Sequence, residues 1–345
     1  MPELSANPEL LPLLRGVSRS FYLSIRLLPG ALRQPIAVAY LLARATDTLA
    51  DTGNAGRAER AAMLGALAGA IDGANPAISA ADISRSFAPL QDDPEERQLI
   101  LALPQCLAWL EQLAPPDRED VRAVLRHITR GQLLDLKRFE PGATRALVNA
   151  AELEEYTYLV AGCVGEFWTD LCFRHLPRFA TLPQGEMREL GRRYGMALQL
   201  VNILRDAGPD LAAGRCYFPA DQLAAAGVAP AEIARRAEAF EPVWRGWQAR
   251  SQDGLEAGMR YADAVRSRRV RVAAALPALI ATRTLALLLM AGPRRLQHKV
   301  KVPRHEVRAL LARIALTFGS RGRLRRWFER WRPEADAERW DNPRP

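Results

Sequence analysis

The chain has 345 residues, of which 49% are hydrophobic and 25% are charged, so it can bury a large core as one helical domain or as two ordinary domains. This composition agrees with a soluble enzyme. The net charge of +9 and the pI near 9.9 favour an anionic partner, but charge alone does not choose among nucleic acid, acidic lipid and a diphosphate.

The N-terminal residues and the cysteines favour a cytoplasmic location. Residues 1–12 are polar and contain proline, without the basic start and apolar stretch of a signal peptide. Cys106, Cys163, Cys172 and Cys216 show no CxxC spacing and lie in apolar or mixed surroundings. We therefore expect reduced, buried thiols in a cytoplasmic protein.

Helix signals recur along the whole chain. Starts such as Asp93-Pro94-Glu95 combine a capping side chain, a first-turn proline and acidic residues, and long Ala- and Leu-rich segments follow. Alternating β-branched runs and a GxGxxG fingerprint are absent from the sequence, which favours an all-α fold over a doubly wound sheet. The predicted helices span residues 30–52, 57–72, 94–112, 117–138, 147–175, 184–207, 229–262, 264–291 and 304–318. A long loop is predicted over residues 74–91 and a functional loop over residues 207–219.

A polar stripe runs along the first of these helices. Its members, three or four positions apart, are Tyr40, Arg44, Asp47 and Asp51. At about 100° per residue such spacing places all four on one narrow face, with the two carboxylates one turn apart. An Asp-x₃-Asp pair by itself is more often a solvated helix face than a site.

A second stripe of the same kind lies about 150 residues further on, in the helix predicted over residues 184–207 and just beyond it. Its members are Gln199, Asn202, Asp206 and Asp210, and the surrounding residues are mostly apolar. Buried carboxylates need compensation, and hard divalent cations such as Mg²⁺ supply it, typically together with substrate phosphate and water. Arg44 and Arg205 stand beside the acids, and arginine binds phosphate oxygens well. The two stripes together predict a metal-diphosphate site, with Gln199 and Asn202 as polar lining.

Two C-terminal segments bear on membranes. Residues 272–292 are mostly apolar, but Pro277 and Arg283 interrupt them, which favours a buried helix over a membrane span. In residues 320–332, arginines alternate with Leu324, Trp327, Phe328 and Trp331. This pattern suits a segment at an anionic bilayer surface and, equally, a solvated helix docked through its tryptophans. We treat residues 319–345 as a basic, Trp-containing tail that follows a catalytic domain over residues 1–318.

Several sequence blocks carry a resemblance to a known family. They read Val17-Ser18-Arg19-Ser20-Phe21, then Tyr40 to Asp51 (YLLARATDTLAD), Tyr156 to Gly165 (YTYLVAGCVG), Gln199 to Asp206 (QLVNILRD) and Gly214 to Pro219 (GRCYFP). These blocks occur in the order and at the separations that are typical of the squalene and phytoene synthase family, which the chain resembles over residues 10–290. The resemblance implies a single-domain, all-α isoprenoid synthase bundle around a central cavity. The Asp-Thr-Leu-Ala-Asp wording is most like that of a bacterial squalene synthase.

The resemblance also implies an activity. Two farnesyl diphosphates would be joined head to head with Mg²⁺ through presqualene diphosphate, and NADPH would then reduce that intermediate to squalene. Its implied metal ligands are Asp47, Asp51, Asp206 and Asp210, and Tyr156 would assist the first half-reaction. Its implied diphosphate-site residues are Ser18, Ser20, Tyr40, Arg44, Arg205, Arg215 and Tyr217. Small residues next to Val160 and Val164 would leave room for the isoprenoid tail, although helix packing explains them equally.

Some positions depart from the family pattern, and several alternatives stay open. Pro209 precedes Asp210 inside a helix that proline would kink or end, Thr52 replaces an acid, and the second tyrosine of its motif is displaced to Tyr158. No residue identifies an NADPH pocket.

The alternatives are a presqualene diphosphate synthase, a phytoene- or dehydrosqualene-type synthase without reduction, and a non-catalytic membrane-surface helical protein. A dinuclear carboxylate bundle needs Glu-x-x-His pairs, which this chain lacks. We expect no nucleic-acid partner and a cytoplasmic location, with peripheral contact at the inner membrane face through residues 320–332.

Overall fold

The computed structural model describes residues 10–18, 25, 28–139, 142–317 and 319–332. Nearly all of its regular structure is helical, which confirms the predicted fold class. The helices before the first strand are α1 (Leu10–Ser18), α3 (Gly30–Asp51), α4 (Arg57–Ile71), α5 (Ala80–Phe87), α6 (Pro94–Leu101), α7 (Leu103–Glu111) and α8 (Pro115–Arg138). Those after it are α9 (Ala150–Thr157), α10 (Cys163–His175), α11 (Gln184–Ala212), α12 (Ala220–Ala225), α13 (Ala237–Ala264), α14 (Arg268–Ala291), α15 (Arg304–Leu316) and α16 (Arg321–Trp331).

Short elements complete the chain between these helices. Two strands, β1 (Arg145–Leu147) and β2 (Arg215–Pro219), pair in parallel with an irregular register after Ala146. Single 3₁₀ turns are η1 (Ala88–Leu90), η3 (Pro230–Glu232) and η4 (Gly292–Leu296), and η2 (Tyr158–Gly162) is a π-helical turn. The strand pair matters because it holds β2 beside α9 and α11.

Helix α11 is the central element of the bundle, and it packs between α10 and α13. Glycines allow the backbones to approach closely on both sides. A Cβ added at Gly165 of α10 would lie 1.9 Å from the Gly191 carbonyl oxygen, and one added at Gly254 of α13 would lie 2.8 Å from the Arg193 carbonyl oxygen. This tight packing holds the second polar stripe in place from both sides.

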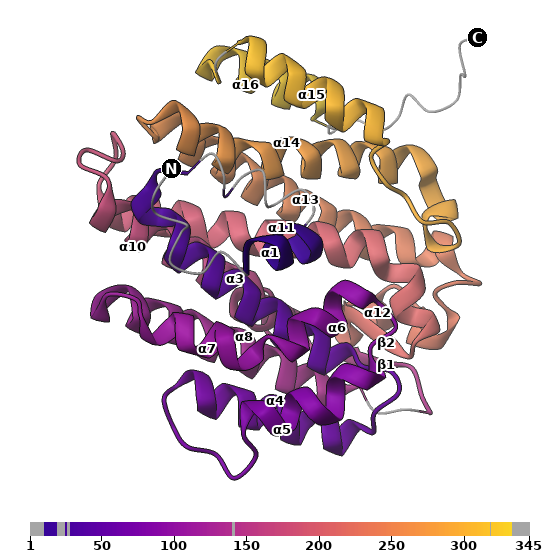
Figure 1. Cartoon of the computed structure of the whole chain (residues 1–345). Coiled ribbons are helices and arrows are strands. Elements are labelled where there is room, and N and C mark those ends of the chain that lie inside the picture. The colour runs from indigo at the N-terminus through magenta and orange to yellow at the C-terminus, as the bar shows by residue number, and fades with distance from the viewer. Residues whose placement is uncertain (1–9, 19–24, 26–27, 140–141, 318, 333–345) are drawn as a thin grey trace.

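The C-terminal helices form a layer on one side of the bundle. Figure 1 shows α15 and α16 at the top, above α14, with α4 and α5 at the opposite end. The helical stretch Arg268–Leu296 is long and apolar enough to cross a membrane, but 67% of its most apolar window is buried inside the protein. Arg283 pairs with Glu306 of α15 at 2.7 Å. Helix α14 therefore serves as a wall of the core, as the sequence predicts.

Several predicted boundaries are wrong, among them the start of the helix predicted over residues 229–262, which begins at Ala237. The expected loop over residues 74–91 contains α5, which begins with a capping box between Ser79 and Asp82. The expected helix over residues 94–112 is divided at Ala102, because Pro104 cannot donate a backbone hydrogen bond. The segment predicted as one helix over residues 147–175 comprises α9, the π-helical turn and α10.

The end of α11 also differs from the prediction. The helix passes through Pro209 and ends at Ala212, so Asp210 stays in the same helix as Asp206. A proline this near a helix end sacrifices only one hydrogen bond of the last turns. Gly208 lets the η4 backbone pack directly on this turn, since a Cβ there would lie 2.0 Å from the Leu296 carbonyl oxygen. The expected functional loop over residues 207–219 is thus the last helical turns, a tight turn and β2.

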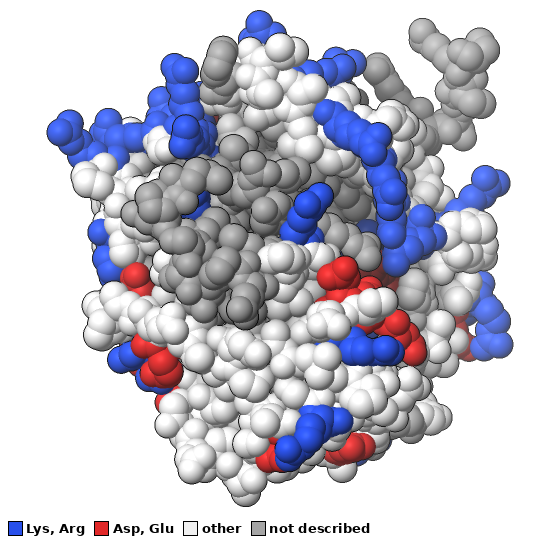
Figure 2. Space-filling view, viewed as in Figure 1, with Lys and Arg blue, Asp and Glu red and all other residues white. Residues whose placement is uncertain are grey.

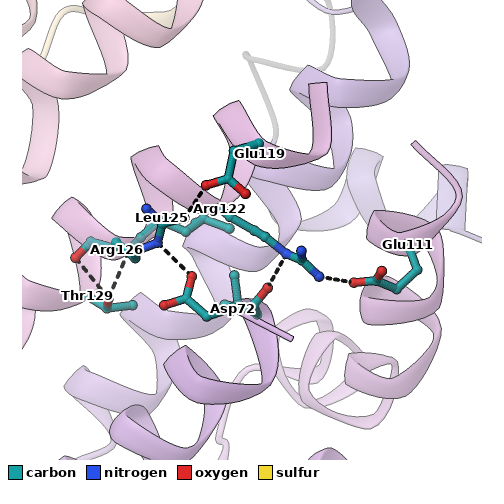
Figure 3. A network of polar contacts seen from close by, with 8 residues as sticks. Asp72, Glu111, Glu119, Arg122, Leu125, Arg126 and Thr129 are labelled. Atoms are coloured by element: carbon teal, nitrogen blue, oxygen red, sulfur yellow. Dashed lines mark hydrogen bonds and ion pairs between the residues drawn. The ribbon is translucent and has the colours of Figure 1, made fainter. Parts of the chain in front are cut away.

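Ion pairs on the surface join α8 to α4 and α7, as Figure 3 shows. Arg122 donates to the Ile71 carbonyl oxygen at 2.9 Å and to Glu111 at 2.5 Å. Arg126 binds Asp72 at 2.8 Å and also Glu119. Exposed pairs of this kind contribute little stability one by one. They lie on one side of α8, and another side of this helix carries residues of the site described below.

Candidate active site

One cavity of about 430 Å³ lies among α3, α8, α9, α11 and β2. Nine of the predicted site residues line it, and they come from four separate parts of the chain. They are Asp47, Asp51, Tyr156, Gln199, Asn202, Asp206, Asp210, Arg215 and Tyr217. The acids of both polar stripes therefore face the same space, whereas Tyr40 and Arg44 of the first stripe do not line it.

Helix α3 supplies the first acidic wall. Gln132 of α8 donates to Asp47 at 2.5 Å, and Arg44 lies 3.9 Å from the same carboxylate. Burial, and then the charge of Asp51, raise the pKa of Asp47 to about 6. Its side chain is nevertheless 48% exposed, because it faces the open cavity, and water there reduces this shift. A cation entering the cavity would relieve the repulsion between the two carboxylates.

Helix α11 and strand β2 supply the second acidic wall. Arg205 holds Asp206 through two hydrogen bonds, one of 3.0 Å from its Nε. Arg215 of β2 holds Asp210 at 2.8 Å, and burial raises the pKa of this carboxylate. Asn202 donates to Gln199 at 3.3 Å. In this wall, unlike the first, an arginine balances each acid, and these arginines could bind phosphate oxygens if a metal ion were held by the carboxylates.

The donor set of the cavity fits a hard cation such as Mg²⁺, since it consists of carboxylate and amide oxygens. Within the described ranges, no three His, Cys, Asp or Glu side chains lie close enough together to hold a metal ion by themselves. Mg²⁺ needs only one or two carboxylates when phosphate and water complete its shell. The two walls therefore suit metal ions that bind together with a diphosphate.

Aromatic side chains and a fifth acid, Asp135, form another part of the cavity wall. The Tyr156 and Tyr217 rings stack 5.0 Å apart, and Phe139 meets Tyr217 edge-on at 5.1 Å. The Tyr217 hydroxyl donates to Asp135 of α8. Burial raises the pKa of Asp135 to about 7, and burial also raises the pKa of Tyr156 well above its ordinary value of 10.0. The carboxyl group of Asp135, which ionises near neutral pH, thus lies beside the neutral phenols of Tyr156 and Tyr217.

A second cavity, of about 420 Å³, shares Asp47 with the first and holds two more predicted residues, Tyr40 and Arg44. The Tyr40 hydroxyl donates to the Val17 carbonyl oxygen at 3.3 Å, and Arg44 forms an ion pair with Glu96 of α6. Figure 2 shows acidic side chains gathered on this face, where Figure 1 places α6. Arg44 therefore stands between two acidic groups at the boundary of the two cavities.

Other predicted residues are not brought to the first cavity, and Arg205 is one of them, since it pairs with Asp206 but does not line the cavity. Ser20 lies outside the described residues, and Ser18 is described only as the last residue of α1. Val160 packs toward Gly131 of α8, and Val164 is 38% exposed, so neither lines this cavity. The small residues beside them serve helix packing, because a Cβ at Gly162 would meet Met196 of α11 at 2.9 Å. The displaced Tyr158 points elsewhere and donates to Glu166 at 3.2 Å.

Helix α8 contributes two residues that the sequence reasoning missed, Gln132 and Asp135. Gln132 binds Asp47, and Asp135 accepts the Tyr217 hydroxyl hydrogen bond. A signal was present in the sequence, because these two polar residues are three positions apart, on one face of a predicted helix. Arg60 of α4, which also lines the cavity and donates to the Ala50 carbonyl oxygen at 2.8 Å, gave no comparable signal.

Comparison with known proteins identifies relatives of this chain. The family model described as squalene/phytoene synthase matches residues 14–306. The bifunctional lycopene cyclase/phytoene synthase of Phaeosphaeria nodorum is 30% identical over 224 residues, which cover 64% of this chain and 35% of that protein. The chain spans about a third of the length of the curated relatives that it matches first.

Solved structures share the fold. A ligand complex of the protein named TcSQS has a TM-score of 0.74 at 18% identity, covering 93% of this chain and 88% of that one. Squalene synthase HpnC from Alicyclobacillus acidocaldarius has a TM-score of 0.59 at 22% identity, covering 84% of this chain and 95% of that one. These matches confirm the predicted isoprenoid synthase fold.

Proposed function

This chain belongs to the squalene/phytoene synthase family, and from that premise we propose that it joins two prenyl diphosphates head to head with Mg²⁺. One observation supports this proposal above the others. Asp47 and Asp51 of α3 and Asp206 and Asp210 of α11 line one cavity, although about 150 residues separate the pairs. A non-catalytic helical protein would have no use for this convergence of acids.

The residues divide the work of binding the diphosphate. Mg²⁺ held by the four aspartates and the substrate phosphates would stabilise the negative charge that develops on the leaving group. Arg44, Arg205 and Arg215 neutralise the remaining charge, because each guanidinium can leave its carboxylate partner for a phosphate oxygen. Gln132 orients Asp47 by its 2.5 Å hydrogen bond.

The aromatic part of the cavity wall suits a carbocation. The stacked rings of Tyr156 and Tyr217, with Phe139 beside them, present aromatic surface to the space where an allylic cation would form. These rings also limit the entry of water, which would otherwise capture the cation. The double bond of a second substrate then attacks, and loss of a proton closes a cyclopropane ring.

For the substrate and final product we propose farnesyl diphosphate and squalene, formed through presqualene diphosphate with hydride from NADPH. The sequence of the first acidic motif, Asp47-Thr-Leu-Ala-Asp51, supports this choice. A second candidate is a phytoene-type reaction without reduction, and the phytoene synthase name of the 30% identical relative favours it. The described residues include no recognisable NADPH pocket, so the proposal of a reductive step rests on the sequence of this motif.

One incubation distinguishes these candidates. The full-length protein receives Mg²⁺ and either farnesyl or geranylgeranyl diphosphate, with and without NADPH, and the products are identified by mass spectrometry. Squalene that forms only with NADPH supports the first candidate. Presqualene diphosphate that persists with NADPH present limits the protein to the first half-reaction, and phytoene or dehydrosqualene supports the non-reductive synthase. A protein that consumes neither substrate contradicts the proposed function.

We also propose a cytoplasmic protein that makes peripheral contact with an anionic membrane through α16. Arg323, Arg326 and Arg330 are exposed, whereas Leu324 and Phe328 are fully buried against the bundle. Figure 2 shows basic side chains gathered on the side where Figure 1 places α15 and α16. Because the apolar residues face inward, the contact would be electrostatic and would not insert into the bilayer.

A further inference from the structure

Asp135 occupies a position that binding of metal and diphosphate does not explain. It lies on α8 in the wall of the cavity, where Tyr217 donates to its Oδ2 atom. Tyr156, stacked on Tyr217, interacts with the same carboxylate. The Oδ1 atom is buried and has no hydrogen-bond partner. A buried carboxylate oxygen without a partner is costly, and such atoms gather where chemistry requires them.

The head-to-head reaction needs a base. Closing the cyclopropane ring releases a proton from carbon, and some group must take it. Burial and the neighbouring Asp135 charge raise the pKa of Tyr156 well above 10.0, so its phenol stays protonated at neutral pH. Tyr156 can pass a proton on, but it cannot be the resting base.

We propose that Asp135 is the acceptor of the proton lost in ring closure, and that the proton reaches it through the hydroxyl of Tyr156. The proposal rests on the proposed head-to-head condensation. Asp135 does not touch the reacting carbons in this scheme, so it acts as a relay residue, and Tyr217 positions its carboxylate.

The step balances without any further reactant. The C–H bond of the coupled cation breaks, and its electron pair forms the third carbon–carbon bond of the ring. The proton moves to the Tyr156 oxygen while the Tyr156 hydroxyl proton moves to Asp135. Tyr156 ends as it began, a neutral phenol, and the carboxylate becomes a carboxylic acid that returns its proton to water after the product leaves.

The surroundings of Asp135 suit this exchange. Arg215 and Tyr217 of β2, together with Tyr156 of α9, favour the carboxylate, whereas burial favours the acid. These opposing influences leave the pKa of Asp135 at about 7, and a group that must both take and release a proton near neutrality works best there. Gln132, one turn earlier on α8, binds Asp47, so one helix face serves both the metal-binding acids and the relay.

The test separates ionisation from ring closure, because ionisation comes first. Asp135→Asn keeps the shape and an acceptor for Tyr217 but cannot take a proton. We expect cyclopropyl diphosphate formation from farnesyl diphosphate and Mg²⁺ to fall about 100-fold or more. Release of inorganic diphosphate should fall less than about tenfold, with the difference appearing as alcohols from capture of the cation by water. The exposed Asp253→Asn on α13 is the matched charge control and should keep the wild-type ratio of the two products.

Two further variants test whether Tyr156 and Asp135 act on the same proton path. Tyr156→Phe should show the same excess of diphosphate release, and the double variant should be no worse than either single one, since both interrupt one path. For Asp135→Ala, added formate should restore the cyclopropyl product, whereas neutral formamide should not. This rescue also decides the matter if Asp135→Asn does not fold.

Other outcomes would overturn the proposal. If diphosphate release and cyclopropyl product fall together in Asp135→Asn, the residue is structural. If the ratio stays at the wild-type value with undiminished product, the released diphosphate is the base. Failure of the proposed function itself looks different, because the wild-type protein would then form no head-to-head product at all.

Discussion

Replacing Asp135 by Asn should make the metal-free protein relatively more stable as the pH rises. Burial raises the pKa of this carboxyl group from 3.8 to about 7 in the folded protein. A group whose pKa is higher when folded stabilises the protein fully below its unfolded value, and that contribution is lost as the pH rises through the folded value. Wild-type protein therefore loses stability between pH 4 and pH 7, and Asn, which does not titrate, avoids the loss.

The expected size follows from the same shift. One pKa unit corresponds to about 1.4 kcal/mol, so the rise from 3.8 to about 7 is worth about 4 kcal/mol over the full range. Between pH 5 and pH 8 the part still to be lost is about 3 kcal/mol, and water in the open cavity reduces it. Any cost of the buried Asn amide is the same at each pH and cancels from this difference.

Urea unfolding in EDTA at pH 5, 6, 7 and 8 measures this effect. The free energy of unfolding of Asp135→Asn, minus that of wild type, should rise by up to about 3 kcal/mol across the series. Asp253→Asn, measured in parallel, controls for loss of one negative charge at an exposed position. A difference that stays constant with pH, or that falls, would refute the reasoning that burial drives the titration of Asp135.

Three further changes test other parts of the structure. Asp47→Asn should lower turnover at least about 1,000-fold while circular dichroism stays unchanged, because a metal ligand is lost but the 2.5 Å Gln132 contact keeps an acceptor; unfolding would instead indicate a structural ion pair. Gly165→Ala should destabilise the protein by at least about 2 kcal/mol in urea, since its Cβ would lie 1.9 Å from the Gly191 carbonyl oxygen, and wild-type stability would contradict that packing. Replacing Arg323, Arg326 and Arg330 together by Gln should weaken binding to anionic vesicles at low salt without changing activity on detergent-dispersed substrate; vesicle affinity equal to wild type would exclude α16 as the contact.

The two polar stripes could be predicted from the sequence because helical periodicity is a local property. Residues three or four positions apart share a helix face whatever the rest of the chain does. Asp47 with Asp51, and Asp206 with Asp210, are therefore paired by their spacing, and the apolar residues around them indicate that these faces turn inward. The motifs around Tyr156 and Tyr217 added the family resemblance, and with it the fold.

Only the tertiary structure decided which other faces meet these stripes. Asp135 and Gln132 became site residues because α8 packs with that face toward the cavity, and local periodicity does not say which helix lies opposite. The same holds for Gly162 and Gly165, whose small size serves the close approach of α11. The effect of Pro209 on the helix was predicted wrongly for a related reason. The η4 backbone packs against Gly208, and the helical turn at Pro209 forms there although proline alone would disfavour it. Long-range packing chooses among conformations that local sequence leaves nearly equal in free energy.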